Sequence, residues 1–331
     1  MPLSPRSLAG RQVNPVGLGC MSLSWAYGNP PGDAEGAALL ERALELGYDH
    51  LDTARIYGVG HNETLIGQAL APYRDRFLLA SKTGIIVDGD KRRIDCRPET
   101  IRTALEVSLK LLQTERIDLY YLHRRDFTVP IEESVGALAE LVAEGKIGGI
   151  GLSEMSAATL RAAAAVHPIA AMQTEYSAMT RNPEIAVLDA CRELGTTFVA
   201  FSPVARGMLA GGYKGVEGLT AKDLRHTMPR FTGDNWAANA ALVAAFDGIA
   251  AREGVTPAQL SLAWVLSRGE HVVAIPGTAR IDHLAENIAR WDWEIPAGVA
   301  AEIDALLNHE TVAGERYTPA MQRTIDTEEF A

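Results

Sequence analysis

The sequence has few cysteines, no long uncharged hydrophobic run and a deficit of positive charge. Only three cysteines occur among its 331 residues. They are widely spaced and form no CxxC pair, which excludes a disulfide framework and a cysteine-based zinc site, and we expect no metal. Free thiols are typical of proteins in a reducing compartment, so we expect a cytoplasmic protein.

The absent hydrophobic runs and the charge deficit exclude further classes. No stretch reaches the ~18 uncharged apolar residues of a membrane span, and the N-terminus lacks the apolar core of a secretory signal. Lys and Arg number 31 against 42 Asp and Glu, which gives a formal net charge of -11. An acidic protein repels phosphate backbones, so we expect neither a membrane nor a nucleic acid as its partner.

The sequence does contain a regular alternation of short apolar runs and amphipathic segments. This pattern predicts strands that are covered on both faces, each followed by a helix. The predicted strands cover residues 15–20, 48–52, 77–81, 117–122, 147–151, 170–174, 196–202 and 272–275. The predicted helices cover residues 33–46, 62–72, 98–112, 131–144, 156–165, 183–194, 256–267 and 280–290.

Strict alternation fits either a doubly wound sheet or a closed (β/α)8 barrel. A doubly wound dinucleotide-binding sheet opens with GxGxxG between a strand and a helix, and this sequence has no such fingerprint. Eight units therefore favour an α/β TIM barrel formed by residues 1–331 as a single domain. Two regions depart from the alternation: residues 203–255, expected to be a long loop after the seventh strand, and an extra C-terminal helix near 296–307 with an irregular tail.

Polar residues follow several predicted strands, at the end that forms the active-site mouth of a barrel. Asp52 and Tyr57 follow the second strand, Lys82 the third and His123 the fourth. Each one alone is explained by an ordinary role in a turn, in packing or in a solvated loop. Four such residues at successive strand ends favour a catalytic site.

These residue types suit proton transfer to a carbonyl oxygen. A free tyrosine titrates near ~10, and an adjacent ammonium such as Lys82 stabilises the phenolate and lowers that pKa. Asp52 would hold the lysine in its charged form, and His123 can donate a hydrogen bond that orients the carbonyl. Protonation of an alkoxide is half of a carbonyl reduction, and the other half is a hydride that no side chain provides.

Seven segments, in chain order, resemble the signatures of the aldo-keto reductase superfamily and in particular of a bacterial-type branch. They are LDTARIYGVGHNETLIGQAL, LLASKTG, IDLYYLH, GKIGGIGLSE, MQTEYS, AFSPVARGMLAGGY and AIPGTARIDHLAEN. The resemblance implies a (β/α)8 barrel that uses NADP(H), without a Rossmann domain, to reduce aldehydes or ketones reversibly. It assigns Asp52, Tyr57, Lys82 and His123 as a catalytic tetrad in which Tyr57 is the acid and base.

The same resemblance assigns contacts to the cofactor and the substrate. Ser153 and Gln173 would hold the nicotinamide carboxamide, and Phe201 would stack on the nicotinamide ring. The other expected cofactor contacts are Gly19, Met21 and Asp52, then Ser202, Val204 and Arg206 at the pyrophosphate, Thr278, Arg280 and His283 at the 2′-phosphate, and Glu286 and Asn287 at the adenine. The expected substrate contacts are Trp25, Tyr57, His123 and Arg124.

The sequence departs from the family's pattern at three places, of which Phe201, in place of a tyrosine common in other branches, is a mild change. Glu154 replaces the usual asparagine after the serine, which brings a negative charge toward the nicotinamide. Gly277-Thr278 replaces a Lys-Ser pair that grips the 2′-phosphate in other branches. Arg280 and His283 lie on one face of a predicted helix, with Asp282 pointing elsewhere, and we expect them to make NADPH the preferred cofactor.

Two other functions stay open at this point. A lysine at a strand end of a barrel is also placed to form an imine, so Lys82 fits a Schiff-base aldolase, although an adjacent carboxylate keeps the amine protonated. Some relatives of this fold are cofactor-sensing binding subunits with little turnover. The complete tetrad argues against that role.

Overall fold

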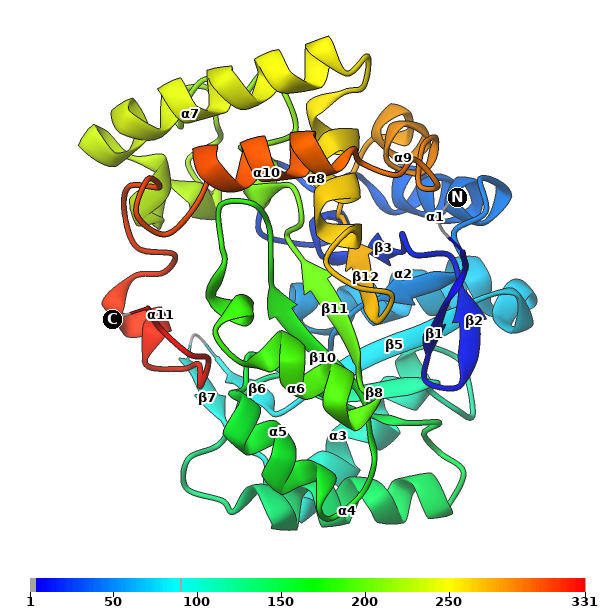
Figure 1. Ribbon diagram of the computed structural model, residues 1–331. Helices are drawn as coiled ribbons and strands as arrows, with labels where there is room; N and C mark the ends of the chain where they lie inside the picture. The colour runs from blue at the N-terminus through cyan, green and yellow to red at the C-terminus, as the bar shows by residue number, and fades with distance from the viewer. Residues whose placement is uncertain (1–3, 90, 331) are drawn as a thin grey trace.

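The computed structural model describes residues 4–89 and 91–330, and its centre is a barrel of eight parallel strands (Figure 1). The strands are β3 (Leu18–Gly19), β4 (His50–Asp52), β5 (Leu78–Thr83), β8 (Leu119–Leu122), β9 (Ile150–Ser153), β10 (Ile169–Glu175), β11 (Thr197–Phe201) and β12 (Val272–Ile275). Each strand pairs with the next one in this list. Parallel bridges from Val16 to Ala274 and from Gly19 to Gly277 join the first strand to the last. The predicted (β/α)8 architecture is confirmed.

Eight helices cover the outside of the barrel, as the alternation predicts. They are α1 (Asp33–Glu45), α2 (His61–Leu70), α3 (Pro98–Leu111), α4 (Ile131–Ala143), α5 (Ala157–Ala164), α6 (Val187–Leu194), α8 (Pro257–Leu266) and α9 (Ile281–Ile288). Two of these helices begin with a side-chain cap. The Ser156 hydroxyl accepts a hydrogen bond from Thr159 N, and the Thr256 hydroxyl accepts one from Gln259 N within a capping box.

Two antiparallel hairpins interrupt the alternation and were not predicted. β1 (Arg6–Leu8) pairs with β2 (Arg11–Val13), and Leu8 and Val13 pack against side chains that fill the barrel interior. β6 (Ile85–Asp88) pairs with β7 (Lys91–Ile94) directly after β5. Each of these four strands contains a charged residue and so lacks the continuous apolar run by which the barrel strands were recognised.

The insertion after the seventh strand is present, but it is not one long loop. Its first part contains the 3-10 turns η5 (Ala205–Gly207), η6 (Leu224–Thr227) and η7 (Pro229–Phe231), and its second part is helix α7 (Gly233–Arg252). The expectation of a loop over 203–255 is wrong here because the second part is rich in alanine, a strong helix former. Figure 1 shows α7 beside α10 (Ala297–Leu306), the predicted extra C-terminal helix.

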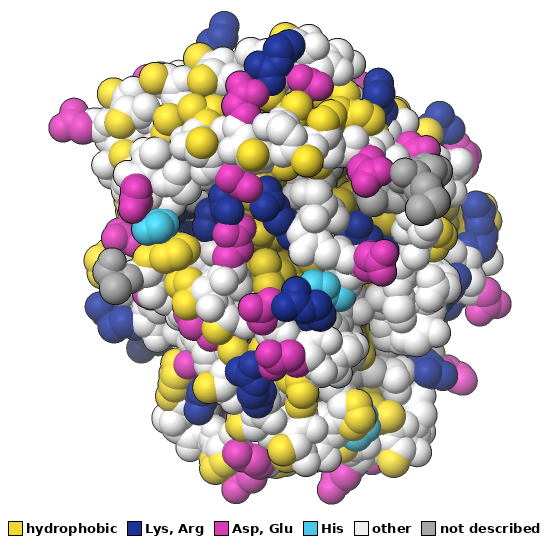
Figure 2. All heavy atoms as spheres, in the orientation of Figure 1, with side chains coloured by type: hydrophobic (Ala, Val, Ile, Leu, Met, Phe, Trp, Pro, Cys, Tyr) yellow, Lys and Arg dark blue, Asp and Glu magenta, His cyan; other side chains and the backbone are white. Residues whose placement is uncertain are grey.

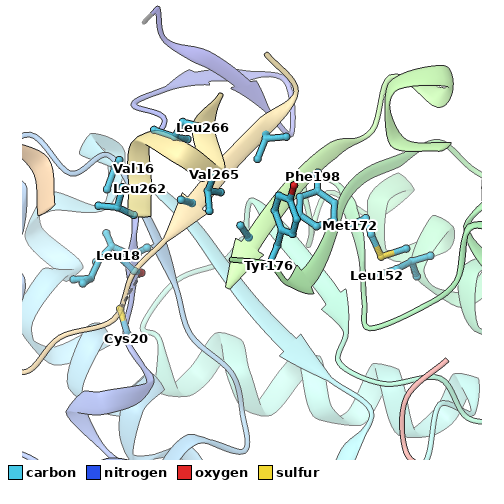
Figure 3. Packing of buried hydrophobic residues seen from close by; sticks show 14 of the residues in the cluster. Val16, Leu18, Cys20, Leu152, Met172, Tyr176, Phe198, Leu262, Val265 and Leu266 are labelled. Atoms are coloured by element: carbon cyan, nitrogen blue, oxygen red, sulfur yellow. Dashed lines mark hydrogen bonds between the residues drawn. The ribbon is translucent and has the colours of Figure 1, made fainter. Parts of the chain in front are cut away.

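Apolar side chains form two layers because successive residues of a strand point to opposite sides. One set fills the barrel interior, with Leu78, Leu119 and Val273 among its members. The other set packs beneath the helices, and Figure 3 shows Tyr176 and Phe198 in this layer. Their rings meet edge to face with centroids 5.7 Å apart.

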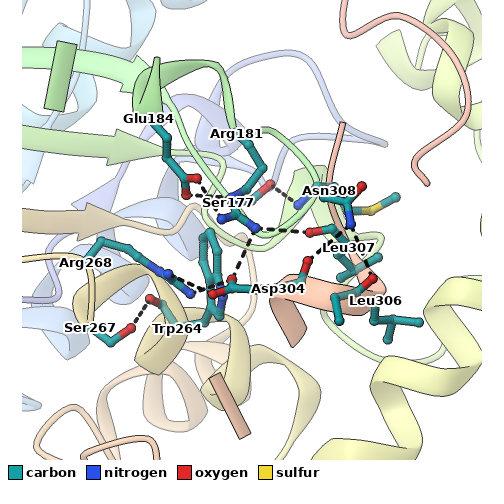
Figure 4. Close-up of polar contacts among 12 residues, drawn as sticks. Ser177, Arg181, Glu184, Trp264, Ser267, Arg268, Asp304, Leu306, Leu307 and Asn308 are labelled. Carbon is teal, nitrogen blue, oxygen red and sulfur yellow. Dashed lines mark hydrogen bonds and ion pairs between the residues drawn. The ribbon is translucent and has the colours of Figure 1, made fainter. Parts of the chain in front are cut away.

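A polar cluster fastens the C-terminal helix to the barrel. Figure 4 shows Asp304 of α10 as its centre. Its carboxylate accepts hydrogen bonds from Arg181 at 3.1 Å, from Arg268 at 2.8 Å and from the Trp264 indole at 3.0 Å. Beyond α10 the tail contains the short helix α11 (Pro319–Gln322) and reaches β9, where Asp326 bridges to Met155. None of the helices in the described ranges has the length and apolar character to span a membrane.

The contact between α2 and the end of α3 depends on a glycine. A Cβ at Gly67 would lie 2.3 Å from Leu111 O, whereas a Cβ at Gly136 of α4 would meet nothing within 4 Å. We expect Gly67→Ala to destabilise the protein by about 1–3 kcal/mol through overpacking against backbone. Gly136→Ala is the matched control, and it should be neutral or should stabilise by up to ~1 kcal/mol. Urea unfolding measures both, and equal effects would contradict this reading of the contact.

Candidate active site

A buried ion pair between Lys82 and Asp52 forms the base of the site. Lys82 is carried by β5 and Asp52 ends β4, and these strands are neighbours in the barrel. The side chains are 0% and 6% exposed, and Lys82 Nζ donates to Asp52 Oδ1 and, at 2.9 Å, to Thr53 O. Burial is the largest single effect and disfavours the ammonium, but the charges and hydrogen bonds of Asp52 and Tyr57 together outweigh it and raise the pKa of Lys82. Lys82 is therefore charged at neutral pH.

Tyr57 presents its hydroxyl to this ammonium. Its Oη lies 3.4 Å from Lys82 Nζ, and the residue is 8% exposed. Burial raises the pKa of Tyr57 and Lys82 lowers it, with a net upward shift. The lowering by the ammonium that the sequence predicts is present, but the loss of water around the phenol is the larger effect. Tyr57 is therefore protonated at neutral pH and can act as a proton donor.

His123 follows β8 and lies against Tyr57. The two rings meet edge to face with centroids 6.0 Å apart, and His123 N donates to Thr83 O at 2.8 Å. Burial lowers the pKa of His123 well below its usual value, and the positive charges of Arg124 and Lys82 lower it further. The imidazole is neutral, so it can donate a hydrogen bond without competing for the tyrosine's proton. The structure thus brings the four predicted catalytic residues together.

The first turn of α2 braces the strands that carry these residues. Asn62 Oδ1 accepts a hydrogen bond from Thr53 Oγ1 at 2.6 Å, and Asn62 Nδ2 donates to Cys20 O at 2.9 Å. Glu63 Oε1 accepts from Ser81 Oγ at 2.6 Å, and both α2 residues are fully buried. These bonds tie together the ends of β3, β4 and β5. Sequence reasoning missed this role of Asn62 and Glu63, because polar residues in the first turn of a helix are usually exposed.

Ser153 and Gln173, the residues expected at the nicotinamide carboxamide, are register partners on β9 and β10. Both are buried. Gln173 Nε2 donates to Asp52 Oδ2 at 2.7 Å, which connects these two strands to the catalytic ion pair. This hydrogen bond therefore connects the expected carboxamide site directly with the catalytic tetrad.

The seam between the first and last strands lies beside this base. Gly19 pairs with Asp52 on one side, and on the other side a Cβ at Gly19 would lie 2.8 Å from Ile275 O. Met21 packs against the small apolar cluster that includes Tyr57. Ser22 Oγ is buried without a hydrogen-bond partner in the described part of the chain, so it is available to a ligand.

Glu154 does not bring an unpaired negative charge to the site, which corrects the expectation from the sequence. Its carboxylate accepts two hydrogen bonds from the guanidinium of Arg316, at 3.1 and 2.8 Å. Arg316 lies in the C-terminal tail and was missed by the sequence reasoning. A charged residue directly after a buried strand requires a partner of opposite charge. Glu154 itself was therefore the one sign in the sequence that a basic residue must lie nearby.

The residues expected at the pyrophosphate lie in a tight loop after β11. They are Ser202, Val204 and Arg206, whereas Phe201, expected to stack on the nicotinamide ring, is the last residue of β11. Arg206 has a φ of 56°, in the left-handed region. Its guanidinium is occupied by protein groups: it pairs with Glu175 at 2.6 Å and donates to Tyr317 Oη at 3.0 Å and Tyr27 Oη at 3.1 Å. The side chain of Arg206 therefore organises the rim, and the loop offers its backbone and hydroxyl groups to a ligand.

The residues expected at the 2′-phosphate gather at the start of α9. Thr278 Oγ1 accepts a hydrogen bond from Arg280 N at 3.0 Å. Arg280 stands just before the helix, with extended backbone, and its Nε donates to Asp282 Oδ1 at 3.0 Å. The expectation that Asp282 points elsewhere is therefore wrong, because Arg280 is not on the helical face. The two side chains are 64% and 62% exposed, so water screens this pair.

The remaining expected contacts lie farther along α9 and around the mouth of the site. On α9, Asn287 is buried, and Glu286 O accepts a hydrogen bond from Gln259 Nε2 at 3.1 Å. Trp25 is 36% exposed, and the Arg92 guanidinium from β7 lies 4.6 Å from the centre of its ring. His123 and Arg124, which are also expected substrate contacts, are joined by a hydrogen bond from Arg124 Nη1 to His123 O at 2.6 Å. Figure 2, in the orientation of Figure 1, shows that acidic and basic side chains are interspersed over the face of the molecule seen there.

Comparisons with known proteins point to one family. A protein-family model described as "Aldo/keto reductase family" matches residues 15–308 of this chain. A curated Glycine max protein, "Probable aldo-keto reductase 1", is 42% identical over 310 residues, which are 93% of this chain and 89% of that protein. Two solved structures are similar over almost their whole length. A glycerol dehydrogenase from Gluconobacter oxydans has a TM-score of 0.85 at 27% identity, covering 96% of this chain and 98% of that one. An aldo-keto reductase from Klebsiella pneumoniae in complex with NADPH has a TM-score of 0.73 at 27% identity, covering 98% and 99%.

The geometry predicts the direction in which Lys82 changes the acidity of Tyr57. Lys82→Met removes the ammonium that lies 3.4 Å from the phenol oxygen, so the pKa of Tyr57 should rise further above its usual value. The chain has nine tyrosines, so the measurement is an ultraviolet phenolate titration from which the same variant with Tyr57→Phe is subtracted. Lys146→Met, at an exposed lysine, serves as the control. An unchanged Tyr57 titration in a folded Lys82→Met protein would contradict the electrostatic role.

Proposed function

Because this chain belongs to the aldo/keto reductase family, we propose that it reduces aldehydes or ketones to alcohols, reversibly, with NADP(H) as cofactor. The observation that carries this proposal is the protonated hydroxyl of Tyr57 held 3.4 Å from the buried, charged Lys82. A proton donor backed by a fixed positive charge is what an alkoxide requires as it forms.

Each member of the tetrad has a distinct task. Tyr57 donates its proton to the carbonyl oxygen, and Lys82 stabilises the phenolate that remains. Asp52 keeps Lys82 charged and in place, and the neutral His123 donates a hydrogen bond that orients the carbonyl. Bound NADPH supplies the hydride, which no side chain provides. In the oxidation of an alcohol, the phenolate of Tyr57 takes the proton back.

The residues at the carboxyl end of the barrel fit a nicotinamide dinucleotide. Ser153 and Gln173 would hold the carboxamide, and the unpartnered hydroxyl of Ser22 is available beside the seam of the barrel. Phe201 would stack on the nicotinamide ring, and the loop of Ser202, Val204 and Arg206 would follow the pyrophosphate. The remaining proposed contacts are Gly19, Met21 and Asp52, with Thr278, Arg280, His283, Glu286 and Asn287 at the adenosine end.

The two other candidate functions are not supported. An imine-forming lysine must lose its proton to act as a nucleophile, whereas Asp52 raises the pKa of Lys82 and holds the ammonium in an ion pair. A binding subunit with little turnover needs no assembled proton donor. Here Tyr57, Lys82 and Asp52 are in contact.

We infer further that the protein acts in the cytoplasm on a small-molecule carbonyl or alcohol. All three cysteines, Cys20, Cys96 and Cys191, are free and buried, which suits a reducing compartment. The net charge of -11 is unfavourable for binding nucleic acid.

The central test is Tyr57→Phe, which removes the proton donor and keeps the ring that packs against His123. We expect turnover of NADPH with a panel of aldehydes and ketones to fall by on the order of 10² or more, while NADPH still binds. Tyr73→Phe, at an exposed position outside the site, should retain full turnover and serves as the control. Near-normal turnover in Tyr57→Phe would remove the basis of the mechanism.

Arg280 is proposed to read the 2′-phosphate, which carries about two negative charges near neutral pH. We expect Arg280→Ala to weaken NADPH binding by about tenfold and to leave NADH binding almost unchanged. Asp282→Asn is the matched control: it releases Arg280 from its partner and should strengthen NADPH binding. Fluorescence titration of both cofactors gives the affinities. Equal weakening of NADPH and NADH in Arg280→Ala would show that Arg280 does not distinguish them.

A further inference from the structure

Glu154 joins the C-terminal tail to β9 and β10. Its carboxylate accepts hydrogen bonds from Arg316 at 3.1 and 2.8 Å and, through Oε1, from Glu175 N at 2.9 Å. Its backbone O accepts from Asp326 N at 2.9 Å. The side chains of Glu154 and Arg316 are 0% and 4% exposed. A single residue thus connects two strand ends with two points on the tail.

The backbone of Glu154 is held in a conformation that its residue type disfavours. Its φ of 55° lies in the left-handed region, where a Cβ is crowded by the backbone. Glu154 N also donates to Gln173 O at 3.0 Å. Such a conformation persists where the surroundings over-determine it, and the bonds from Arg316 and Glu175 supply this constraint. The strained residue directly follows Ser153.

We propose that Arg316 is a positioning residue for the nicotinamide end of the cofactor site, and that it acts through Glu154 on Ser153 and Gln173. The inference rests on the NADP(H) site of the proposed function. Ser153 is bonded in sequence to Glu154, and Gln173 O accepts the hydrogen bond of Glu154 N. If the strained turn at Glu154 relaxes, Ser153 and Gln173, the residues proposed to hold the carboxamide, are therefore displaced together.

Arg316 is itself held firmly. Its Nη2 donates to Thr327 Oγ1 at 2.9 Å, and its guanidinium lies 4.7 Å from the centre of the Tyr317 ring. Burial opposes its charge most strongly, but Glu154, Tyr317 and Glu175 together outweigh burial and raise the pKa of Arg316, so the pair stays ionised. The tail has a separate anchor at the start of α5, where Asp326 accepts from Thr159 Oγ1 at 2.5 Å. Removing the Arg316 pair therefore leaves the tail attached elsewhere.

The test separates the nicotinamide half of the cofactor from the rest. Affinities for NADP+ and for 2′-phospho-ADP-ribose, which lacks the nicotinamide, are measured by titration for the wild type and for Arg316→Met. We expect the variant to bind NADP+ about tenfold more weakly, the effect of losing roughly one charge-assisted hydrogen bond, and 2′-phospho-ADP-ribose equally well. Glu154→Gln, which keeps the side-chain shape, should lose NADP+ affinity in the same selective way.

Arg316→Met leaves Glu154 buried without its counter-charge and can fail to fold. In that case Glu154→Gln/Arg316→Met, which removes both charges, decides the question by the same two titrations. Arg181→Met is the control, because Arg181 anchors the same C-terminal segment through Asp304 and Leu307 O. It should change neither affinity.

Selective loss of NADP+ affinity supports the proposal. Equal loss for both ligands, or no loss for either, overturns it, because a merely structural tail does not distinguish the two halves of the cofactor. Failure of the wild type to bind NADP+ at all would instead refute the proposed function.

Discussion

The ion pair between Lys82 and Asp52 sets the geometry on which the rest of the site depends. Two buried ions cost several kcal/mol each in lost hydration unless their remaining hydrogen-bonding capacity is used. Here Gln173 supports Asp52 from β10, and Thr53 O supports Lys82. A slip of one residue in the register of β4 and β5 would turn one charge into the apolar layer beneath the helices. The fold and the chemistry therefore depend on the same contact.

The rim of the barrel contains further buried charge. Two acids at neighbouring strand ends, Glu154 and Glu175, pair with Arg316 of the tail and Arg206 of the loop after β11. Arg230 lies against the same cluster and donates to Met179 O at 2.6 Å and to the Thr180 hydroxyl at 2.8 Å. Burial lowers the pKa of Arg230 to about 10. The tail and the insertion after β11 are thus integral walls of the site, because their arginines compensate charges that the strands present.

The parts of this structure that follow from periodicity and strand-end chemistry were predictable from the sequence. Continuous apolar runs marked the eight strands, and the residues at their carboxyl ends marked the tetrad. Contacts between distant segments were not predictable: Glu154 and Arg316 are separated by 162 positions, and no local pattern connects them. The pairing of Arg280 with Asp282 was missed for another reason, because it depends on the exact residue at which α9 begins. The hairpins were missed because each of their strands contains a charged residue that interrupts the apolar signal.

The barrel closes between segments from opposite ends of the chain. Gly17 N donates to Ala274 O at 2.9 Å, and Gly19 N donates to Pro276 O at 3.1 Å. During synthesis, one edge of β3 therefore stays unpaired until β12 has been made. Exposed strand edges template pairing with other chains, and natural proteins limit this hazard with very short edge strands. β3 has two residues and β12 has four. The shortness of these two strands thus protects the nascent chain from edge-to-edge aggregation in the interval before closure.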